Sequence, residues 1–260
     1  MNIWLIHCAG KVASVSIANA LVDAGMETGE NRIFKTHVIN AENKSNHSKQ
    51  AHASGHLASS EAFLDLYASD RYDKCYVITG QRDPVGQAIS AFFQNIPIYM
   101  GKEHLSCSDL YCVLSRLYEK IDFITKYITT TWWKSQFEDF FGNDPFKFDF
   151  DKAAGISCVE ESRKLIFVFY TVERGLILLP KVLEMLSGKM PISIGHRNSV
   201  ADSRHFKPYN NPVEIAEIYA SVMKQFRLPR ATLQTMYDRE SVRFFYDQTQ
   251  IEGFIQRWQR

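Results

Sequence analysis

Three short segments combine basic, hydroxyl and imidazole side chains where a β-strand is expected to end. The first follows the apolar run 3–8 and contains Lys11, Ser14 and Ser16. Free N–H groups and the dipole at a helix start attract phosphate, and a lysine and hydroxyls complete such a cradle. It is not a Walker A loop, because Leu5 stands where that motif has its first glycine and Val12 where it has Ser or Thr. The alternative is that Ser14 only caps the helix and Lys11 is solvated.

An arginine and a serine lie around a second predicted strand–helix junction. Arg82 follows the apolar run 75–80, Asp83-Pro84 begins a helix, and Ser90 comes eight residues after Arg82. Proline suits the first helical position, so Ser90 falls about two turns into the helix, on the side that Arg82 can share. A guanidinium fork and a hydroxyl suit one phosphate monoester. The alternative is a capped helix with the arginine in a surface ion pair.

The third segment is Lys35-Thr36-His37, at the end of another predicted strand. Residues two apart on a strand point to the same face. If that face overlooks the site, His37 has the chemistry of a base near neutral pH, and Lys35 can stabilise an anion. For this tripeptide alone, an ordinary pair at a strand end is the alternative. If His37 is not the base, His7 and the histidines of residues 41–60 are the next candidates.

The order of the three segments resembles that of the sulfotransferases that use 3′-phosphoadenosine 5′-phosphosulfate (PAPS). Strand, Lys/Ser turn and helix come first, Lys-Thr-His second, and strand, Arg-x7-Ser and helix third. This motif-level resemblance covers residues 3–95. The whole chain is also similar to a family of capsular polysaccharide synthesis proteins, through GISCVEESRKLIFVFYTVERG (155–175) and MYDRESVRFFYDQTQIEGFIQRW (236–258).

This resemblance implies a P-loop-like sulfotransferase fold and a set of cofactor-binding residues. Arg82 and Ser90 would hold the 3′-phosphate of PAPS, and Arg197 and Lys207 would belong to a third binding segment, 196–209. The loop that would hold the 5′-phosphosulfate consists of Lys11, Val12, Ala13, Ser14, Val15 and Ser16.

The resemblance also implies the catalytic roles. His37 would take the proton of an acceptor hydroxyl, on a glycan or a small molecule, while Lys11 and Lys35 would stabilise the charge on the leaving phosphate and the moving sulfuryl oxygens. Lysines that supply this charge make a metal unnecessary. The first loop departs from the family pattern, because Ala13 replaces a common glycine and Val15 a hydroxyl residue. A non-catalytic nucleotide-binding or interaction protein of polysaccharide assembly therefore remains the alternative, with a P-loop kinase behind it.

The elements that position these segments alternate along the chain. Apolar runs at 3–8, 32–39, 75–80 and 164–170 indicate buried strands, and helical patterns follow the first, third and fourth. The polar residues 41–60 indicate a long surface loop, residues 109–141 a helical stretch, residues 146–162 a small hairpin and the last 60 residues helices. We predict an α/β fold, a parallel sheet flanked by helices with a helical C-terminal part, as one domain over 1–260.

Composition limits the partners. Hydrophobic residues make up 45% and charged residues 23%, as in an ordinary globular protein. The net charge of +1 gives no global field for nucleic acid or an anionic membrane. No apolar run reaches the ~20 residues of a membrane span, and the start of the chain lacks a basic segment typical of a signal peptide.

Cysteines and histidines give weaker signals. The five cysteines include no Cys-x-x-Cys pair, which indicates reduced thiols and a cytoplasmic location. His47, His52 and His56 have no cysteine or acidic cluster beside them, so we expect no metal site there.

Overall fold

The computed structural model describes residues 1–39, 53–100, 110–188, 191–195 and 212–260. Its contacts divide the chain into two compact units, each formed by two stretches of sequence. The first unit comprises Met1–Gln81 and Trp132–Arg197, and the second comprises Arg82–Thr131 and Asn198–Arg260. Each unit is described by itself, and the single domain expected for residues 1–260 stays a prediction.

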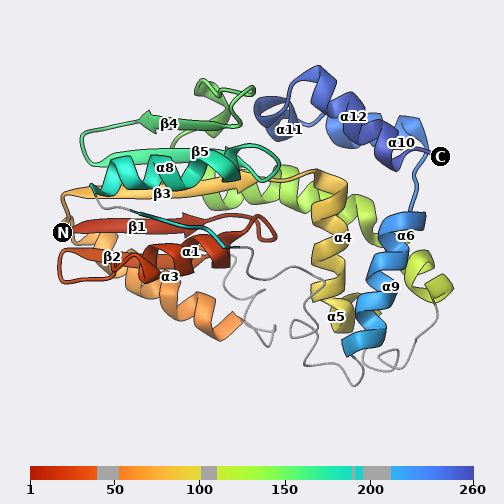
Figure 1. Cartoon of the computed structure of the whole chain (residues 1–260), viewed down its shortest axis with the longest axis horizontal. Coiled ribbons are helices and arrows are strands. Elements are labelled where there is room, and N and C mark those ends of the chain that lie inside the picture. Colours follow the sequence, from red (N-terminus) through yellow and green to blue (C-terminus); the bar gives the residue numbers. More distant parts are fainter. Residues whose placement is uncertain (40–52, 101–109, 189–190, 196–211) are drawn as a thin grey trace. The chain divides into compact units, whose positions relative to one another are not determined.

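A five-stranded sheet forms the centre of the first unit (Figure 1). Its order is β2 (Asn31–Thr36), β1 (Asn2–His7), β3 (Lys74–Gln81), β5 (Leu165–Thr171) and β4 (Ile156–Glu160). The first four strands pair in parallel, whereas β4 is antiparallel to β5. The α/β class with a mostly parallel sheet is therefore confirmed.

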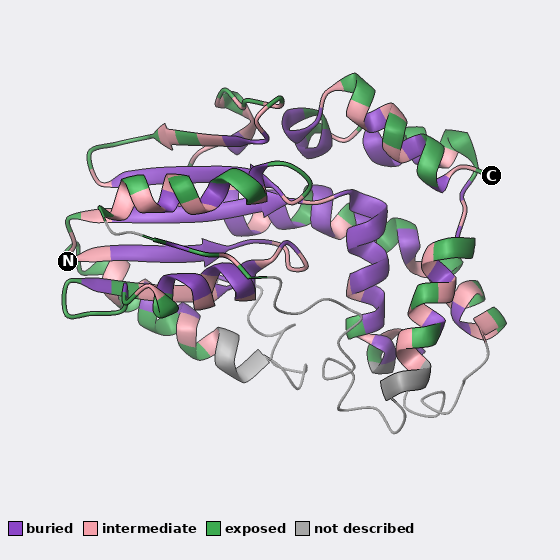
Figure 2. Cartoon of the chain, viewed as in Figure 1, coloured by how far each residue is buried: buried purple, intermediate pink, exposed green. Residues whose placement is uncertain are grey.

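The three inner strands are almost wholly buried, as their colour in Figure 2 shows. Strands covered on both faces need apolar side chains on both, which explains why they read as continuous apolar runs in the sequence. The chain leaves β1 toward β2 and returns on the other side of β1 to form β3. The carboxyl ends of β1 and β3 therefore flank the switch point at which α/β sheets bind ligands.

Helices cover both faces of this sheet. On one face α1 (Ser14–Asp23) and α8 (Gly175–Ser187) contribute Ile17 and Leu179 to a core with Ile78. On the other face lie α3 (Ala53–Ala68) and the segment of η4 (Trp133–Glu138) and α7 (Asp139–Phe141). There the ring of Phe137 packs 5.0 Å from that of Phe167 of β5.

Two expectations for loops and turns are wrong. Residues 53–60, expected within a surface loop, form the first half of α3, while residues 40–52 lie outside the described part. Residues 146–155 form no strand with 156–162. The hairpin is instead made by β4 and β5, because Ser162 and Leu165 exchange two backbone hydrogen bonds at the turn between them.

The described residues of the second unit are helical, and their bounds confirm the helical C-terminal part. Its helices are α4 (Pro84–Gln94), α5 (Ile96–Met100), α6 (Leu110–Lys126), the π-helix η3 (Tyr127–Thr131), α9 (Pro212–Gln225), α10 (Arg230–Tyr237), α11 (Glu240–Phe245) and α12 (Gln248–Trp258). Tyr118 of α6 stacks on Phe226, which follows α9, at 4.6 Å between ring centroids.

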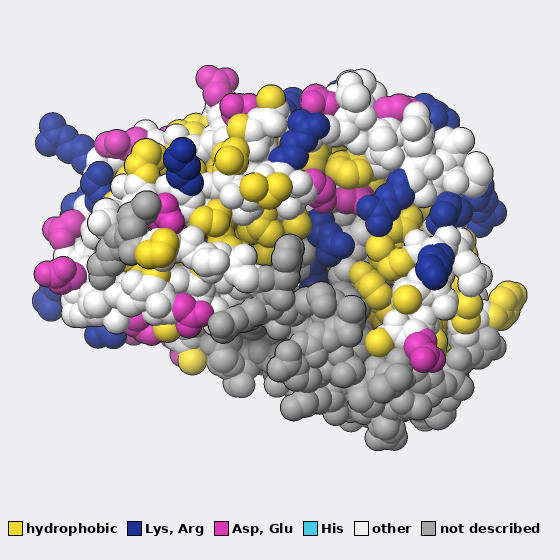
Figure 3. Space-filling model, viewed as in Figure 1, with side chains coloured by type: hydrophobic (Ala, Val, Ile, Leu, Met, Phe, Trp, Pro, Cys, Tyr) yellow, Lys and Arg dark blue, Asp and Glu magenta, His cyan; other side chains and the backbone are white. Residues whose placement is uncertain are grey.

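Some apolar side chains reach the surface of the first unit over α8 (Figure 3), where Ile177 is 79% exposed and Met185 72%. Scattered exposure of this kind is normal for a globular protein. Within the described residues, no helix has the length and apolar character that crossing a bilayer requires.

Candidate functional site

The loop after β1 has an unusual backbone. Gly10, Lys11 and Ala13 all have positive φ, at 87°, 61° and 65°. Lysine and alanine rarely adopt this region, because their Cβ atoms crowd the backbone there. Successive turns of this type direct N–H groups into a concave surface that binds anions, and strained backbone of this kind gathers at functional sites. The structure therefore gives the predicted phosphate loop a geometry suited to an anion.

Helix α1 begins at the end of this loop without a side-chain cap, because its N-cap residue is Ala13. Ser14, which could have been the cap, hydrogen-bonds the thiol of Cys8 instead. Burial raises the pKa of this thiol to about 11, so it is neutral at pH 7. The N-terminal amides of α1, which a cap would otherwise engage, belong to the positive end of the helix dipole. The predicted alternative, in which Ser14 serves as a helix cap, is wrong.

A tyrosine on a distant strand anchors the loop. The Tyr170 hydroxyl on β5 donates a hydrogen bond to the carbonyl oxygen of Val12, whose side chain is fully buried. The Tyr170 ring reaches this carbonyl by crossing Gly80 of β3, where a Cβ atom would lie 2.5 Å from the ring. Sequence reasoning missed both residues. The available signal was the glycine inside the buried strand CYVITG, since such glycines mark close approaches.

His37 lies beside the same loop. Its Nδ1 atom is 2.5 Å from the Cys8 carbonyl oxygen, and since that oxygen can only accept, Nδ1 carries the proton. The neutral ring then has its lone pair on Nε2. Cε1 and Nε2 are each 3.8 Å from the position that a Cβ atom on Gly10 would occupy, so the ring edge that carries the basic nitrogen lies beside the loop.

Lys35 lies in β2, two residues before His37, which follows the end of the strand. Burial lowers the pKa of its half-buried ammonium group, and the Cys8 thiol acts in the opposite direction. Lys35 therefore interacts electrostatically with Cys8, and His37 hydrogen-bonds the Cys8 carbonyl oxygen. Cys8 precedes the loop that contains Lys11, and all four residues belong to the first unit.

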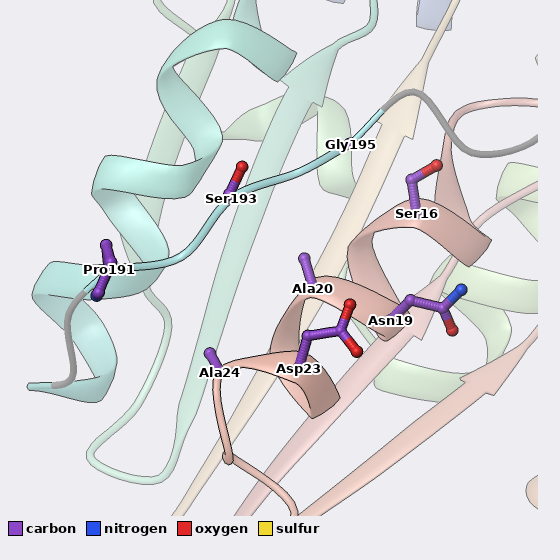
Figure 4. Close-up of a pocket in the computed structure, with 8 residues that line it drawn as sticks. All are labelled: Ser16, Asn19, Ala20, Asp23, Ala24, Pro191, Ser193 and Gly195. Atoms are coloured by element: carbon purple, nitrogen blue, oxygen red, sulfur yellow. The ribbon is translucent and has the colours of Figure 1, made fainter.

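A cavity of about 350 Å³ lies along α1 (Figure 4). It begins at Ser16, in the first turn of the helix, and continues past Asn19 and Asp23. Ser193 and Gly195 line its opposite side. Its polar side chains offer both hydrogen-bond donors and acceptors next to the loop. Val15, also predicted as a cofactor residue, is half-buried in the same turn.

Arg82 and Ser90 meet in the second unit, as their spacing predicts. The Arg82 Nη1 atom is 3.4 Å from Ser90 Oγ, and Ser90 is almost fully buried. The Ser90 hydroxyl donates to the Gly86 carbonyl at 2.9 Å, so its oxygen accepts from Arg82. Tyr219 of α9, which sequence reasoning missed, places its hydroxyl 3.1 Å from Ser90 Oγ. The Ser90 hydroxyl is therefore within hydrogen-bond distance of both the Arg82 guanidinium and the Tyr219 hydroxyl.

Asp83 fixes the helix start between Arg82 and Ser90. Its Oδ1 accepts from the Tyr237 hydroxyl at 2.5 Å and its Oδ2 from Trp258 Nε1 at 2.8 Å. Burial raises the pKa of this carboxyl group, although these hydrogen bonds oppose the shift. Asp83 also caps α4 through the Val85 amide, and Pro84 is the first residue of the helix, as predicted.

The remaining predicted residues are not described. Arg197 and Lys207 lie outside the described residues, as do His47 and His52, and the side chain of His56 is not described either. The third cofactor segment and the expected lack of a metal site therefore stay predictions.

Two clusters of groups whose chemistry suits an anion result, one in each unit. The first combines a loop with left-handed residues, which contains Lys11, with Lys35 and the His37 imidazole. The second combines Arg82, Ser90 and Tyr219. Comparison of the chain with protein-family models, curated proteins and solved structures found no match.

Proposed function

We propose that this protein is a PAPS-dependent sulfotransferase with a P-loop-like fold that transfers a sulfuryl group to an acceptor hydroxyl. The observation that carries the proposal is the position of His37, because the ring edge that carries Nε2 lies beside the left-handed loop that contains Lys11. A base directed at an anion-binding loop suits proton removal next to a transferring group.

Each of the two clusters has groups that suit one charged end of PAPS. The loop of residues 11–16 would bind the 5′-phosphosulfate through its amides, Lys11 and the start of α1. Arg82 and Ser90 would bind the 3′-phosphate, for which a guanidinium fork and a hydroxyl are suited. The cavity along α1 begins at Ser16 and is polar, so it supports a place for the nucleoside. Arg197 and Lys207 would complete the cofactor site.

His37 and the lysines would perform the transfer. PAPS, when bound, supplies an activated sulfuryl group. His37 Nε2 takes the proton of the acceptor hydroxyl while that oxygen forms its bond to sulfur, and the bond from sulfur to the 5′-phosphate oxygen breaks. Lys11 and Lys35 stabilise the negative charge on the departing phosphate and the sulfuryl oxygens. The products are a sulfate ester and adenosine 3′,5′-bisphosphate, with the proton held on His37. Because lysines supply the positive charge, we propose a metal-independent reaction.

The acceptor would be a glycan or a small hydroxyl compound, and this part rests only on the resemblance to capsular polysaccharide synthesis proteins. The described thiols of Cys8 and Cys75 are buried and unpaired, in keeping with the proposed cytoplasmic location. A non-catalytic nucleotide-binding protein would use the same anion-binding groups without the base, and it is therefore an outcome of the test below.

Calorimetry with adenosine 3′,5′-bisphosphate and AMP tests cofactor recognition. We expect much tighter binding of the bisphosphate, because losing a charged bidentate contact costs about 2–4 kcal/mol. Arg82→Ala should erase most of this preference. Arg230→Ala is the matched control, because Arg230 forms an exposed ion pair with Glu252 in the same unit and should leave the preference unchanged.

The results separate the candidates. Equal binding of AMP, ATP and the bisphosphate by the wild type would refute the 3′-phosphate assignment and favour a kinase. Selective binding without sulfuryl transfer to any of a panel of hydroxyl acceptors would favour the non-catalytic alternative. Selective binding with transfer that survives EDTA is the result that the proposal requires.

A further inference from the structure

We propose that Trp132 and Gln136 are positioning residues for His37, acting on the backbone of the segment that carries it. The inference rests on the proposed function, in which His37 is the base. It assigns a role beyond packing to the buried segment that contains Trp132 and Trp133.

Side chains from this segment bind the backbone on the C-terminal side of His37. The Trp132 indole Nε1–H donates to the His37 carbonyl oxygen at 2.9 Å. Two residues further on, the Ile39 amide donates to Gln136 Oε1 at 2.8 Å. Trp132 and Gln136 are both almost completely buried, so water competes little for these hydrogen bonds.

His7 of β1 binds the backbone on the N-terminal side. Its Nδ1 lies 3.2 Å from the Thr36 carbonyl oxygen and its Nε2 2.9 Å from the Gln136 carbonyl oxygen. The ring also packs 4.7 Å from Trp132. His7 thus contacts the Thr36 carbonyl and Trp132 the His37 carbonyl, and the rings of His7 and Trp132 pack against each other. His7 also contacts the Gln136 carbonyl, so it too is linked to the segment 132–136.

The helix that carries these residues has an uncommon form. Residues 127–131 and 133–138 are both π-helical, with Trp132 between them. A π-helix is normally a single turn and is often found at functional sites. Because this form is intrinsically unfavourable, contacts outside the helix must compensate for it. The hydrogen bonds that Trp132 makes with His37 and Gln136 with Ile39 are contacts of this kind.

The consequence for the imidazole follows from geometry. The ring is attached to a backbone held by Trp132, and its Nδ1–H donates to Cys8. Because the His37 backbone and Nδ1 are both held, the ring edge that carries Nε2 stays beside the loop. Releasing the backbone would allow the ring to turn away from Cys8, and then Nδ1–H and Nε2–H tautomers would both form. Misplacing a reacting group by about 1 Å can cost ~100-fold in rate.

Adjacent tryptophans provide a matched experiment. Trp132 and Trp133 are both buried, but Trp133 donates its indole N–H to Gln81 instead, at 3.2 Å. Trp132→Phe and Trp133→Phe therefore remove the same chemical group from neighbouring sites. The readout is the tautomer of His37, measured on the full chain by long-range ¹H–¹⁵N NMR of the imidazole at a pH where it is neutral, with His37→Ala identifying the signal.

We expect the Nδ1–H tautomer to dominate in the wild type and in Trp133→Phe, and a mixture of tautomers in Trp132→Phe. With an active acceptor, kcat of Trp132→Phe should fall by ~10–100-fold, with KM and bisphosphate affinity within about threefold. If Trp132→Phe does not fold, Gln136→Met, which removes the acceptor of the Ile39 amide, should shift the tautomers in the same direction.

A His37 tautomer unchanged in both Trp132→Phe and Gln136→Met would overturn the inference. An Nε2–H tautomer in the wild type would overturn it as well. Neither result depends on turnover, so a failure of sulfuryl transfer in the wild type would count against the proposed function alone. An equal tautomer change in Trp133→Phe would mean that packing, and not the Trp132 hydrogen bond, holds the ring.

Discussion

The ring of Tyr170 lies across Gly80 of the neighbouring strand, and a Cβ atom added to Gly80 would be 2.5 Å from the Tyr170 Cζ atom. Through this close approach the Tyr170 hydroxyl reaches the carbonyl of Val12, in the loop after β1, which is two strands from β5 in the sheet. The absence of a side chain at position 80 therefore helps to hold this loop in its left-handed conformation.

Gly80→Ala should lower the free energy of unfolding by about 1–3 kcal/mol or more, because the new methyl group overlaps a buried ring that cannot move away without losing its hydrogen bond. Urea denaturation measures the change. Gly253→Ala is the control, because Gly253 lies in α12 with nothing within 4 Å of an added Cβ. It should raise the free energy of unfolding by about 0.5–1 kcal/mol. A loss of stability no larger at position 80 than at 253 would contradict the close packing.

Ala13→Gly should stabilise the protein, although alanine is normally the better residue near a helix. Ala13 has φ 65° and ψ 16°, a conformation that costs an L-residue about 1–2 kcal/mol and glycine much less. Part of the gain is lost to the greater freedom of glycine in the unfolded chain, so we expect about 0.5–1 kcal/mol.

The matched control is Ala18→Gly, inside α1, which should destabilise by about 1 kcal/mol. Thermal unfolding of the two variants should therefore give shifts of opposite sign. Destabilisation by both would mean that Ala13 is not held in the left-handed region.

The sequence predicts most features that depend on a single strand or helix. Continuous apolar runs locate β1, β3 and β5, because strands buried on both faces need them. The spacing of Arg82 and Ser90 predicts their contact because Pro84 fixes where the helix begins. The i, i+2 spacing of Lys35 and His37 predicts that their side chains point to the same face. These are consequences of local periodicity, which the chain displays directly.

Other features depend on contacts between distant residues. Residues 53–60 are polar and small, yet they form part of a helix whose Ser59 accepts a hydrogen bond from the Lys35 amide of β2 and whose Ser60 donates to the carbonyl of Val38, which follows β2. Strand β4 forms an antiparallel hairpin with β5. No local pattern in the sequence distinguishes this hairpin from the one expected within residues 146–162. The Tyr170–Val12 contact and the π-helix have their causes 95 or more residues away along the chain. Of the two, only the Tyr170–Val12 contact has a local sign in the sequence, which is the glycine at position 80.

His7 should make stability depend on pH below neutrality. Burial lowers the pKa of its imidazole from 6.5 to about 4, although the carbonyls of Gln136 and Thr36 oppose the shift. Between these values the unfolded chain binds a proton that the folded chain does not. The contribution of His7 to the free energy of unfolding is therefore complete above pH 6.5. It falls as the pH decreases toward 4, by about 3 kcal/mol in total. Denaturant unfolding at several pH values measures this decline.

His7→Gln, which removes the titrating group, should be less stable at pH 7 but should decline less between pH 6.5 and 4. The difference in slope between the two proteins isolates the imidazole from the carboxyl groups, which both proteins share. Parallel stability curves would show that His7 has an ordinary pKa in the folded state.

Thr79→Val should stabilise the protein. Within the described residues, the buried Thr79 Oγ1 atom has no hydrogen-bond partner, and a buried hydroxyl without a partner costs about 1–3 kcal/mol. Valine has the same shape, so we expect a gain of about 1 kcal/mol in urea denaturation. Thr171→Val on the neighbouring strand is the control, because the Thr171 hydroxyl donates to the Gly155 carbonyl and accepts from the Gly175 amide. It should destabilise, and a similar loss at position 79 would reveal a partner for Thr79.

The last prediction concerns the base itself. His37→Ala should lower turnover by ~10²–10⁴, the usual contribution of a positioned proton acceptor. The affinity for adenosine 3′,5′-bisphosphate should stay within a few fold, because the proposed role of Nε2 is toward the acceptor hydroxyl. In the wild type, turnover should decline as the pH falls through the imidazole pKa, since a protonated ring cannot accept a proton.

Lys35→Ala should behave differently from His37→Ala. Turnover should fall because positive charge near the transferring group is lost, but the decline at low pH should remain, because His37 is intact. Stopped assays over a pH series with both variants separate the two roles. If His37→Ala loses folding stability but keeps its turnover, His37 serves only to pack the end of β2. His7 would then be a poor substitute, because its imidazole is buried between two carbonyls, and the base would have to come from the histidines of residues 41–60.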